Sequence, residues 1–403
     1  MKVLFQIFFI MQVALQLGAQ GNDISINVSK VTDSIYTFGC AEVQVAAINT
    51  SEGIIIIDTH RSPSVMQKIL ERVKETFGNK PIKYVINTHG HQDHTGGNQL
   101  FDPAIIIGHT NAPEYIRQFP ANTIRNIWFP GDHAKELAKD LPYLEGEEKV
   151  LLQQNVNAWE LIAGDMETRY KLTPPQLTVR NGDELTSGGI TLNFFSCGTL
   201  HTNNDLFVVV PELNVMFTGD VMSRYSQWSF NPNALTDIKE LISLLKKIVR
   251  DFPKLKYVIP AHDEPFPASD LKKTILLLEE RESEIDYSAS GALYLKSVIA
   301  SKEFKSVIAG FINNSRLAGL TFDESELSQL AQEYESRGKL TESIAILELS
   351  LNLLKSPLLV YDDLGRNYLK TGQEEKAVKS YETLLKIFPQ YRIAGEILKR
   401  IRK

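Results

Sequence analysis

Cysteine is scarce in this sequence, which has only Cys40 and Cys197 among its 403 residues. Two cysteines allow at most one disulfide bond. They either pair in an oxidising compartment or serve as small buried hydrophobic side chains. The spacing in the sequence leaves both alternatives open, because a disulfide bond needs the two α-carbons within bonding range.

An excess of positive charge is also missing. Lysine and arginine together number 43, against 49 aspartates and glutamates, which gives a net charge of −6. This balance gives no electrostatic reason to expect a nucleic-acid partner. Hydrophobic residues make up 43% of the chain and charged residues 23%, which is typical of a soluble globular protein. The length favours one large domain with a smaller one beside it.

Long apolar runs are absent after the first twenty residues, so no later segment predicts a membrane-spanning helix. Residues 1–20 read MKVLFQIFFIMQVALQLGAQ, in which one lysine precedes an apolar run that ends in Gly18 and Ala19. This layout is typical of a secretory signal peptide, cleaved near Ala19 or Gln20. A single membrane anchor and a buried N-terminal helix are the alternatives. With a signal peptide, we expect the mature protein to be exported to the periplasm or the extracellular space.

The first half of the mature chain predicts an α/β arrangement. A helix is expected over residues 62–78, because a Ser-Pro start precedes apolar residues at helical spacing and Gly78 ends the pattern. Runs rich in isoleucine and valine, bounded by turn residues, predict strands on either side of this helix. These runs cover residues 34–39, 43–59, 82–88 and 104–109.

Three of the eight histidines lie within six consecutive positions, in the segment THGHQDHTGG at residues 88–97. Protonated imidazoles this close together would repel one another, whereas a metal ion binds neutral imidazoles and a carboxylate in one place. The segment follows the expected strand at 82–88, and α/β folds place their ligands at this edge of the sheet. We therefore expect a metal site here.

A second block of expected strands supplies three more potential ligands. The strands within residues 190–202, 205–222 and 256–266 lead to His201, Asp220 and His262. Together with the first segment they provide seven donors, a number that suits two metal ions better than one. The seven donors are His89, His91, Asp93, His94, His201, Asp220 and His262.

This set of residues resembles the metal-binding pattern of the metallo-β-lactamase fold superfamily of binuclear hydrolases. Residues 89–94 match the family pattern H-x-H-x-D-H, His201 its later histidine, Asp220 its bridging aspartate and His262 its last histidine. Asp58 matches the acidic residue that the family keeps beneath the site in a supporting role. The resemblance covers roughly residues 23–278 and implies an αββα sandwich with the site at one edge.

The resemblance also implies how the donors are divided between two zinc ions, with Asp220 bridging them. One ion would be bound by His89, His91 and His201, and the other by Asp93, His94 and His262. Two such ions share a water, lower its pKa and deliver hydroxide to an electrophile. Asp93 is the candidate catalytic residue, because it also can orient this nucleophile. Manganese or iron fits the same mixed donors, so the metal number is better defined than its identity.

Asp220 separates this sequence from the true β-lactamases, in which the family commonly has cysteine or serine at this position. An aspartate is typical of the superfamily's hydrolases of thioesters, lactones, sulfate esters and phosphodiesters. We therefore expect a small-molecule substrate with an ester-like bond. The alternatives are a β-lactam hydrolase and a non-catalytic protein that binds partners, and the intact ligand set favours an enzyme.

Substrate choice is expected to depend on the segment between His109 and Arg180, which separates the two strand blocks. It contains a helical hairpin over about residues 133–170, whose aromatic side chains either wall a pocket or pack the hairpin onto the sandwich. A second candidate wall follows Asp220, where Arg224 pairs with an anionic substrate group or with a surface carboxylate. The candidate substrate-binding residues are Trp128, Arg224, Tyr225 and Trp228.

The C-terminal part repeats with a period of 34 residues, in which Gly338 corresponds to Gly372 and Tyr334 to Tyr368. This pattern resembles two tetratricopeptide repeats, of which the second is the better copy. Two repeats bury little surface, so we expect them to dock on the helical segment at 291–315. They bind a protein partner, mediate self-association or cap the catalytic domain.

The sequence thus predicts an exported binuclear zinc hydrolase of the α/β class. An αββα metallo-β-lactamase sandwich is followed by an all-α tetratricopeptide-like region. Four parts are expected, namely a signal peptide (1–20), a catalytic domain (23–280), a helical linker (281–323) and the repeats (324–403).

Overall fold

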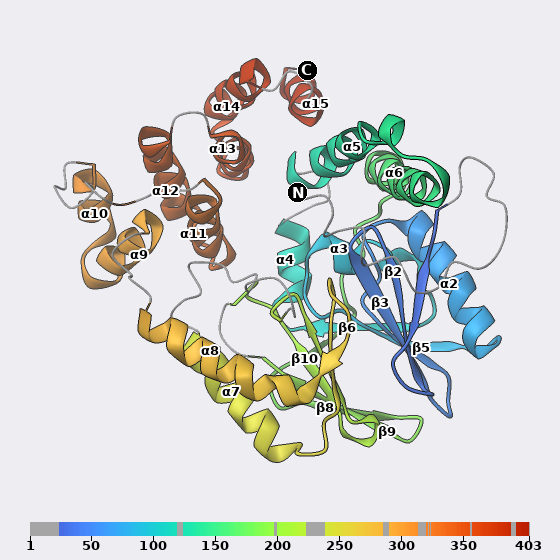
Figure 1. Cartoon of the computed structure of the whole chain (residues 1–403). Helices are drawn as coiled ribbons and strands as arrows, with labels where there is room; N and C mark the ends of the chain where they lie inside the picture. The colour runs from blue at the N-terminus through green and yellow to red at the C-terminus, as the bar shows by residue number, and fades with distance from the viewer. Residues whose placement is uncertain are drawn as a thin grey trace.

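The computed structural model describes residues 24–118, 124–196, 200–222, 238–284, 290–312, 320, 322, 324–354, 357–387 and 392–402. Within these ranges two β-sheets face each other, helices cover both outer faces, and a further group of helices follows toward the C-terminus (Figure 1). The expected sandwich with a helical C-terminal region is therefore confirmed. Among the described helices, none combines the length and the apolar character that crossing a membrane requires.

The first sheet has seven strands that follow one another in chain order. The strands from β1 to β4 pair antiparallel, and those from β4 to β7 pair in parallel. The carboxyl ends of the parallel strands therefore meet at one edge, where α/β folds place their sites. The strands are β1 (Asn27–Lys30), β2 (Ile35–Cys40), β3 (Val43–Asn49), β4 (Ile54–Ile57), β5 (Ile82–Ile86), β6 (Ile105–His109) and β7 (Leu177–Val179).

The second sheet has six strands in the order β13-β12-β11-β10-β9-β8. Only β11 and β12 pair in parallel among the pairs that the structure describes in this sheet, and the helix α7 (Ile238–Asp251) lies between them in the chain. Asp220 and His262 follow these two strands and so reach the same edge. The strands are β8 (Glu184–Ser187), β9 (Ile190–Phe195), β10 (Phe207–Val210), β11 (Val215–Gly219), β12 (Tyr257–Pro260) and β13 (Phe266–Pro267).

A continuous hydrophobic core fills the space between the two sheets. Alternate residues of β4, such as Ile55 and Ile57, face Phe217 and Ile259 of the second sheet within one buried cluster. Strands that carry apolar residues on both faces need helices on the outside as well. With helices outside both sheets, β4 and β10 are buried along their whole length.

Three helices cover the outer face of the first sheet: α2 (Pro63–Phe77), α5 (Ile124–Ala138) and α6 (Gly146–Thr168). Ser62 begins α2 as its N-cap and accepts a hydrogen bond from Val65 N. Trp159 of α6 is 2% exposed and belongs to this core, against which Tyr170 also packs. These two aromatic residues therefore pack the hairpin onto the sandwich. The side chains of Trp128 and Phe129 lie outside the described residues.

The helices α7 and α8 (Leu271–Glu284) cover the outer face of the second sheet. Shorter helical segments make the connections near the site and at the turns. These segments are α3 (Gln92–Thr95), α4 (Ala112–Gln118), η2 (Asn98–Leu100), η3 (Leu141–Tyr143), η4 (Pro211–Leu213) and η6 (Ala268–Asp270).

The C-terminal helices share a hydrophobic core of their own. It extends from Ala292 and Leu295 to Ala394 and Leu398, so the region expected to be a linker contributes to the core of the repeats. The first helix of the repeats, α11, also packs against α4 beside the sandwich. The helices are α9 (Gly291–Ser301), α10 (Phe304–Gly310), α11 (Glu324–Ser336), α12 (Leu340–Leu353), α13 (Leu358–Lys370), α14 (Glu374–Ile387) and α15 (Arg392–Ile401).

Candidate metal centre

The seven expected ligands meet at the edge of the sandwich where β5, β11 and β12 end. They form two groups of side chains that share Asp220, and within each group the candidate ligand atoms all lie within 4.8 Å of one another. This division is the one that the sequence resemblance implies. The first group is His89, His91, His201 and Asp220, and the second is Asp93, His94, Asp220 and His262.

In the first group, nitrogen atoms of His201 and His89 lie near one oxygen of Asp220, and His91 lies beside His201. His201 Nε2 lies 2.9 Å from His91 Nδ1 and 3.3 Å from Asp220 Oδ2, and His89 Nε2 lies 3.7 Å from the same oxygen. A tetrahedral zinc ion with bonds of about 2.0–2.1 Å places its ligand atoms about 3.3 Å apart. The observed separations therefore fit a zinc ion among these side chains.

The second group has similar separations and uses both oxygens of the shared carboxylate. His94 Nε2 lies 3.1 Å from Asp220 Oδ1, and His262 Nε2 lies 3.2 Å from Asp220 Oδ2. Asp93 Oδ2 lies 3.6 Å from His94 Nε2 and 3.5 Å from His262 Nε2. A second ion of the same size fits between these atoms.

Three atoms of the site are buried without a hydrogen-bond partner, namely His89 Nε2, His94 Nε2 and Asp220 Oδ1. The last two lie close together, but their geometry is not that of a hydrogen bond. A buried polar atom without a partner is costly, and a bound cation removes that cost by accepting the lone pairs. The donors present in this chain therefore fit the metal ions that the fold family implies.

The second ring nitrogen of three histidine ligands contacts a neighbour. His94 Nδ1 donates to Asp58 Oδ2 at 3.1 Å, and His262 Nδ1 donates to the carbonyl oxygen of Glu42 at 2.6 Å. Thr88 Oγ1 lies 3.3 Å from His89 Nδ1. A proton held on Nδ1 leaves the lone pair on Nε2, so these contacts direct Nε2 at the centre of the site.

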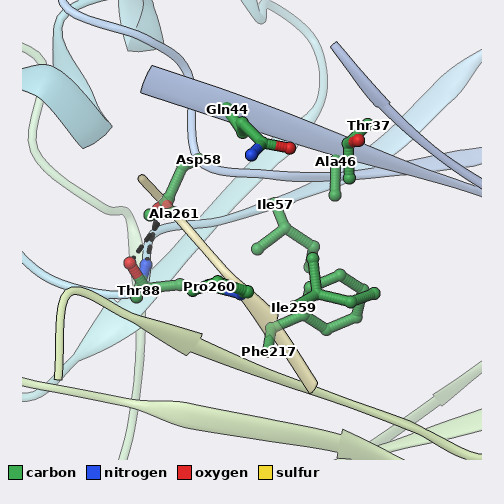
Figure 2. Close-up of a pocket in the computed structure, with 11 residues that line it drawn as sticks. Thr37, Gln44, Ala46, Ile57, Asp58, Thr88, Phe217, Ile259, Pro260 and Ala261 are labelled. Carbon is green, nitrogen blue, oxygen red and sulfur yellow. Dashed lines mark hydrogen bonds between the residues drawn. The ribbon is translucent and has the colours of Figure 1, made fainter. Parts of the chain in front are cut away.

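Asp58 lies beneath the site, where the resemblance places a supporting acidic residue. Its two oxygens accept hydrogen bonds of 2.8 Å from the backbone N–H and the hydroxyl of Thr88, drawn as dashed lines in Figure 2. The figure also shows a small cavity next to this pair, between the two sheets, with Ile57, Phe217 and Ile259 in its wall. Asp58 thus joins the end of β4 to the ligand segment that follows β5.

Burial and neighbouring charges shift the pKa values of the site residues. Burial lowers the pKa of His89 well below its usual value. Burial has the same effect on His262, but the carboxylates of Asp220 and Asp93 outweigh it and raise the pKa of His262 to about 9. Burial alone would raise the pKa of Asp220, yet the surrounding histidines hold it well below its usual range. The shared carboxylate therefore stays charged.

His201 lies in a turn some residues beyond β9, and not directly at the strand end where the sequence predicts it. Asp205 holds this turn by accepting hydrogen bonds from the backbone N–H groups of His201 and Thr202. Asn204 is fully buried and accepts a hydrogen bond of 2.6 Å from Gly90 N. The turn is therefore tied to the segment that carries the other ligands.

Two residues next to the site are absent from the sequence prediction, the buried His60 and the partly buried Arg61. Ser62 N donates to His60 Nδ1 at 3.2 Å, so His60 Nε2 donates to the carbonyl oxygen of Cys40 at 3.0 Å. Burial lowers the pKa of His60 to about 4. Arg61 Nη2 lies 3.2 Å from Asp93 Oδ2. The sequence signal for both residues is weak, since it consists only of their position shortly after Asp58 at the end of β4.

Two glycines allow the segments at 58–62 and 91–97 to touch. A Cβ atom at Gly96 would lie 1.9 Å from the carbonyl oxygen of Arg61, and one at Gly97 would lie 2.3 Å from that of Thr59. Such distances leave no room for any side chain. The backbones are also joined by a hydrogen bond from Thr59 N to the carbonyl oxygen of His94.

Three of the four candidate substrate-binding residues fall outside the described residues, namely Arg224, Tyr225 and Trp228. The fourth, Trp128, has a described backbone in α5 but no described side chain. Cys197 also lies outside the described residues, whereas Cys40 is buried in the core under α2.

Comparison with known proteins identifies the family. Residues 39–262 match the model of the metallo-beta-lactamase superfamily, and residues 359–391 match a tetratricopeptide repeat. Together with the two-sheet fold and the His/Asp groups, the first match places this protein in a class of metal-dependent hydrolases. Because it spans more than half of the chain, the protein belongs to the metallo-beta-lactamase superfamily.

Curated relatives share only part of this chain. The beta subunit of 2,4-dinitroanisole O-demethylase from Nocardioides sp. is 31% identical over 83 residues, 20% of this chain and 26% of that subunit. The alpha subunit of the same enzyme is 30% identical over 94 residues, 23% of this chain and 29% of that subunit. The chain thus spans less than a third of the length of these relatives.

Solved structures with similarity to this chain include a metallo-beta-lactamase from Pontibacter korlensis. It is 17% identical, with a TM-score of 0.44, over 63% of this chain and 99% of that chain. A stereoselective inverting sec-alkylsulfatase from Pseudomonas sp. is 14% identical, with a TM-score of 0.47, over 87% of this chain and 66% of that chain.

Proposed function

We propose that this hydrolase is a binuclear zinc enzyme that cleaves an ester-like bond of a small molecule. The observation that carries the proposal is the position of Asp220 in both ligand groups. Its Oδ1 faces His94, and its Oδ2 faces His201 and His262. A carboxylate with both oxygens engaged in this way is suited to bridge two ions. Manganese or iron is the alternative for the same donors.

The residues of the site would have separate roles in metal binding and in orienting the ligands. His89, His91 and His201 would hold the first ion, while Asp93, His94 and His262 would hold the second. Asp58, Thr88 and the carbonyl of Glu42 orient the rings of three of these ligands, His94, His89 and His262 respectively. When bound, two zinc ions supply an acidified water as the nucleophile and polarise the electrophile. Asp93, whose side chain is 15% exposed, would be the residue that orients that nucleophile.

The substrate class is proposed from Asp220, since the sequence resemblance associates an aspartate there with thioesters, lactones, sulfate esters and phosphodiesters. A β-lactam is the alternative. The names of the curated relatives add an aryl methyl ether, 2,4-dinitroanisole, as a compound to test. A non-catalytic role in partner binding is disfavoured, because every expected ligand lies in one of the two groups.

The experiment removes all metal with a chelator, returns zinc in steps, and measures hydrolysis of one compound from each of these classes. We expect turnover to appear as the second equivalent of zinc binds. His89→Gln should abolish it, whereas His109→Gln, at the end of β6 and outside both groups, should not. Full activity with one ion or none would overturn the binuclear proposal, and no turnover of any compound would leave the partner-binding alternative.

We also propose that the chain is exported and that its repeats take part in protein contacts. The layout of residues 1–20 supports export to the periplasm or the extracellular space. The tetratricopeptide match at 359–391 supports binding of a partner or a second copy. N-terminal sequencing of the mature protein tests the first proposal, since an intact residue 1 would contradict it.

A further inference from the structure

The carboxylate of Asp93 makes only long contacts with the two histidines of its group. Asp93 lies in α3, a helix of only four residues, and its Oδ2 is 3.5 Å from His262 and 3.6 Å from His94. Both separations exceed those of a hydrogen bond. Three of the histidine ligands, in contrast, have a second ring nitrogen in contact with a neighbour, namely His89, His94 and His262.

Arg61 makes the shortest charged contact of Asp93. Its Nη2 lies 3.2 Å from Asp93 Oδ2, and its side chain is only 14% exposed. The Nε of the same guanidinium is buried and has no hydrogen-bond partner. Burying an arginine costs free energy unless a carboxylate compensates it, and the contact with Asp93 supplies such a carboxylate.

The backbone on both sides of Arg61 is fixed as well. Ser62 N-caps α2 and donates from its hydroxyl to Asp165 of α6 at 2.5 Å. On the other side, Thr59 N donates to the carbonyl oxygen of His94. The guanidinium therefore approaches Asp93 from a rigid support, as an orienting group must.

We propose that Arg61 is the positioning residue of the second metal site, which holds the Asp93 carboxylate so that Oδ2 faces His94 and His262. This role rests on the binuclear function proposed above. Arg61 contacts a metal ligand and is not itself expected to bind the ion. A planar guanidinium restrains a carboxylate better than an ammonium group does, so lysine should replace it only in part.

The test measures metal binding without any substrate. Apoprotein of the wild type, Arg61→Lys and Arg61→Gln is titrated with zinc against a chromophoric chelator, and with cobalt to follow the absorption bands of each site. For Arg61→Gln we expect second-ion affinity to fall about 10- to 100-fold, as for other residues that support a ligand. First-ion affinity should stay within about twofold, and the lysine variant should lie in between.

Arg169→Gln is the matched control. Arg169 contacts Ser64 and Asp165, which lie in the same contact region and are not ligands. This variant loses the same charge and should bind both ions as the wild type does. In an Asp93→Asn background, Arg61→Gln should have no further effect on the second ion, because the carboxylate that it holds is gone.

Each outcome decides between the proposals. Unchanged second-ion affinity in Arg61→Gln, or equal losses at both sites, would overturn the positioning role. If the glutamine variant does not fold, the lysine variant decides, and wild-type affinity for the second ion would overturn the role. A wild type that binds one ion or none would instead defeat the binuclear proposal itself.

Discussion

At the scale of single residues, the chemistry of the site depends on which nitrogen of each histidine carries a proton. The type and spacing of the ligands could be predicted from the sequence, because His and Asp at strand ends are rare unless they bind something. The partner of His262 could not be predicted from the sequence, because it is the backbone carbonyl of Glu42 and every residue has a carbonyl. Arg61 was missed because its contact with Asp93 joins two loops that only the folded chain brings together.

The shared carboxylate leads to the first prediction. Asp220→Ala should weaken the binding of at least one ion and lower kcat/KM by orders of magnitude, because the negative charge between the two groups is lost. Asp220→Cys should keep substantial zinc but lose most activity, since a thiolate binds one ion better than it bridges two. Zinc per chain and kcat/KM are measured together. Asp33→Ala, which removes an exposed carboxylate, is the control, and unchanged turnover in Asp220→Ala would exclude a bridging role.

His60 leads to a prediction on the pH dependence of stability. Its folded-state pKa of about 4 is below the unfolded value of 6.5, so the unfolded chain takes up this proton first as the pH falls. The free energy of unfolding should therefore decrease from pH 6.5 down to about 4, by up to about 3 kcal/mol from this residue. Denaturant unfolding of the metal-free protein measures it.

The comparison for His60 is the variant His60→Gln, which cannot titrate. Its stability should be lower at neutral pH, because glutamine does not reproduce both hydrogen bonds, but should fall less steeply toward pH 4. The same slope in both proteins would contradict the assignment to His60.

At the scale of elements, the hairpin of α5 and α6 is joined to the site through Asp165. This residue is 2% exposed and accepts hydrogen bonds from Ser62 Oγ, Ser64 N and Ser64 Oγ. The sequence predicts the hairpin from its helical spacing, but it does not predict this contact, since nothing distinguishes Asp165 from a solvated acidic residue. Short strands with exposed residues, such as β1 and β8, were missed because they lack an apolar run.

Asp165 leads to the third prediction. Asp165→Ala leaves the N–H of Ser64 and the hydroxyl groups of Ser62 and Ser64 without their acceptor, so it should lower the free energy of unfolding by about 3 kcal/mol. The change is measured by denaturant unfolding. Glu160→Ala removes an exposed carboxylate from the same helix and should change stability by less than about 0.5 kcal/mol. Equal effects of the two variants would show that the contact is not stabilising.

At the scale of the whole molecule, the hydrophobic cores divide the chain more clearly than the sequence does. The helices α9 and α10 share a core with the repeats, in which Leu295 and Phe311 take part. The repeat period predicts the helices of the repeats. It does not distinguish a helix that packs against them from a helical linker, because the surface on which such a helix packs is not known from the sequence. A cut between α8 and α9 leaves the three cores of the sandwich whole.

Truncation at this point is the fourth prediction. A chain that ends at Glu284 should remain folded and keep its metal content and its turnover of a small substrate, while losing any partner contact or self-association. A chain that ends at Ile312 keeps α9 and α10 without the rest of their core, so it should aggregate. Size-exclusion chromatography and metal analysis distinguish the two. An insoluble shorter chain would instead show that the repeats cap the sandwich, where α11 meets α4.

The close backbone approach at Gly96 and Gly97 should make both positions intolerant of substitution. In a saturation library sorted only for soluble expression, with no demand for activity, we expect both positions to accept glycine alone. The ligands beside them, such as His91, should tolerate several residues under the same sorting, because their loss empties a site without forcing two backbones apart. The two least tolerant positions of the loop would then be glycines that are not metal ligands. Their intolerance to mutation would reflect the contact between two backbone segments and not the chemistry of the neighbouring site.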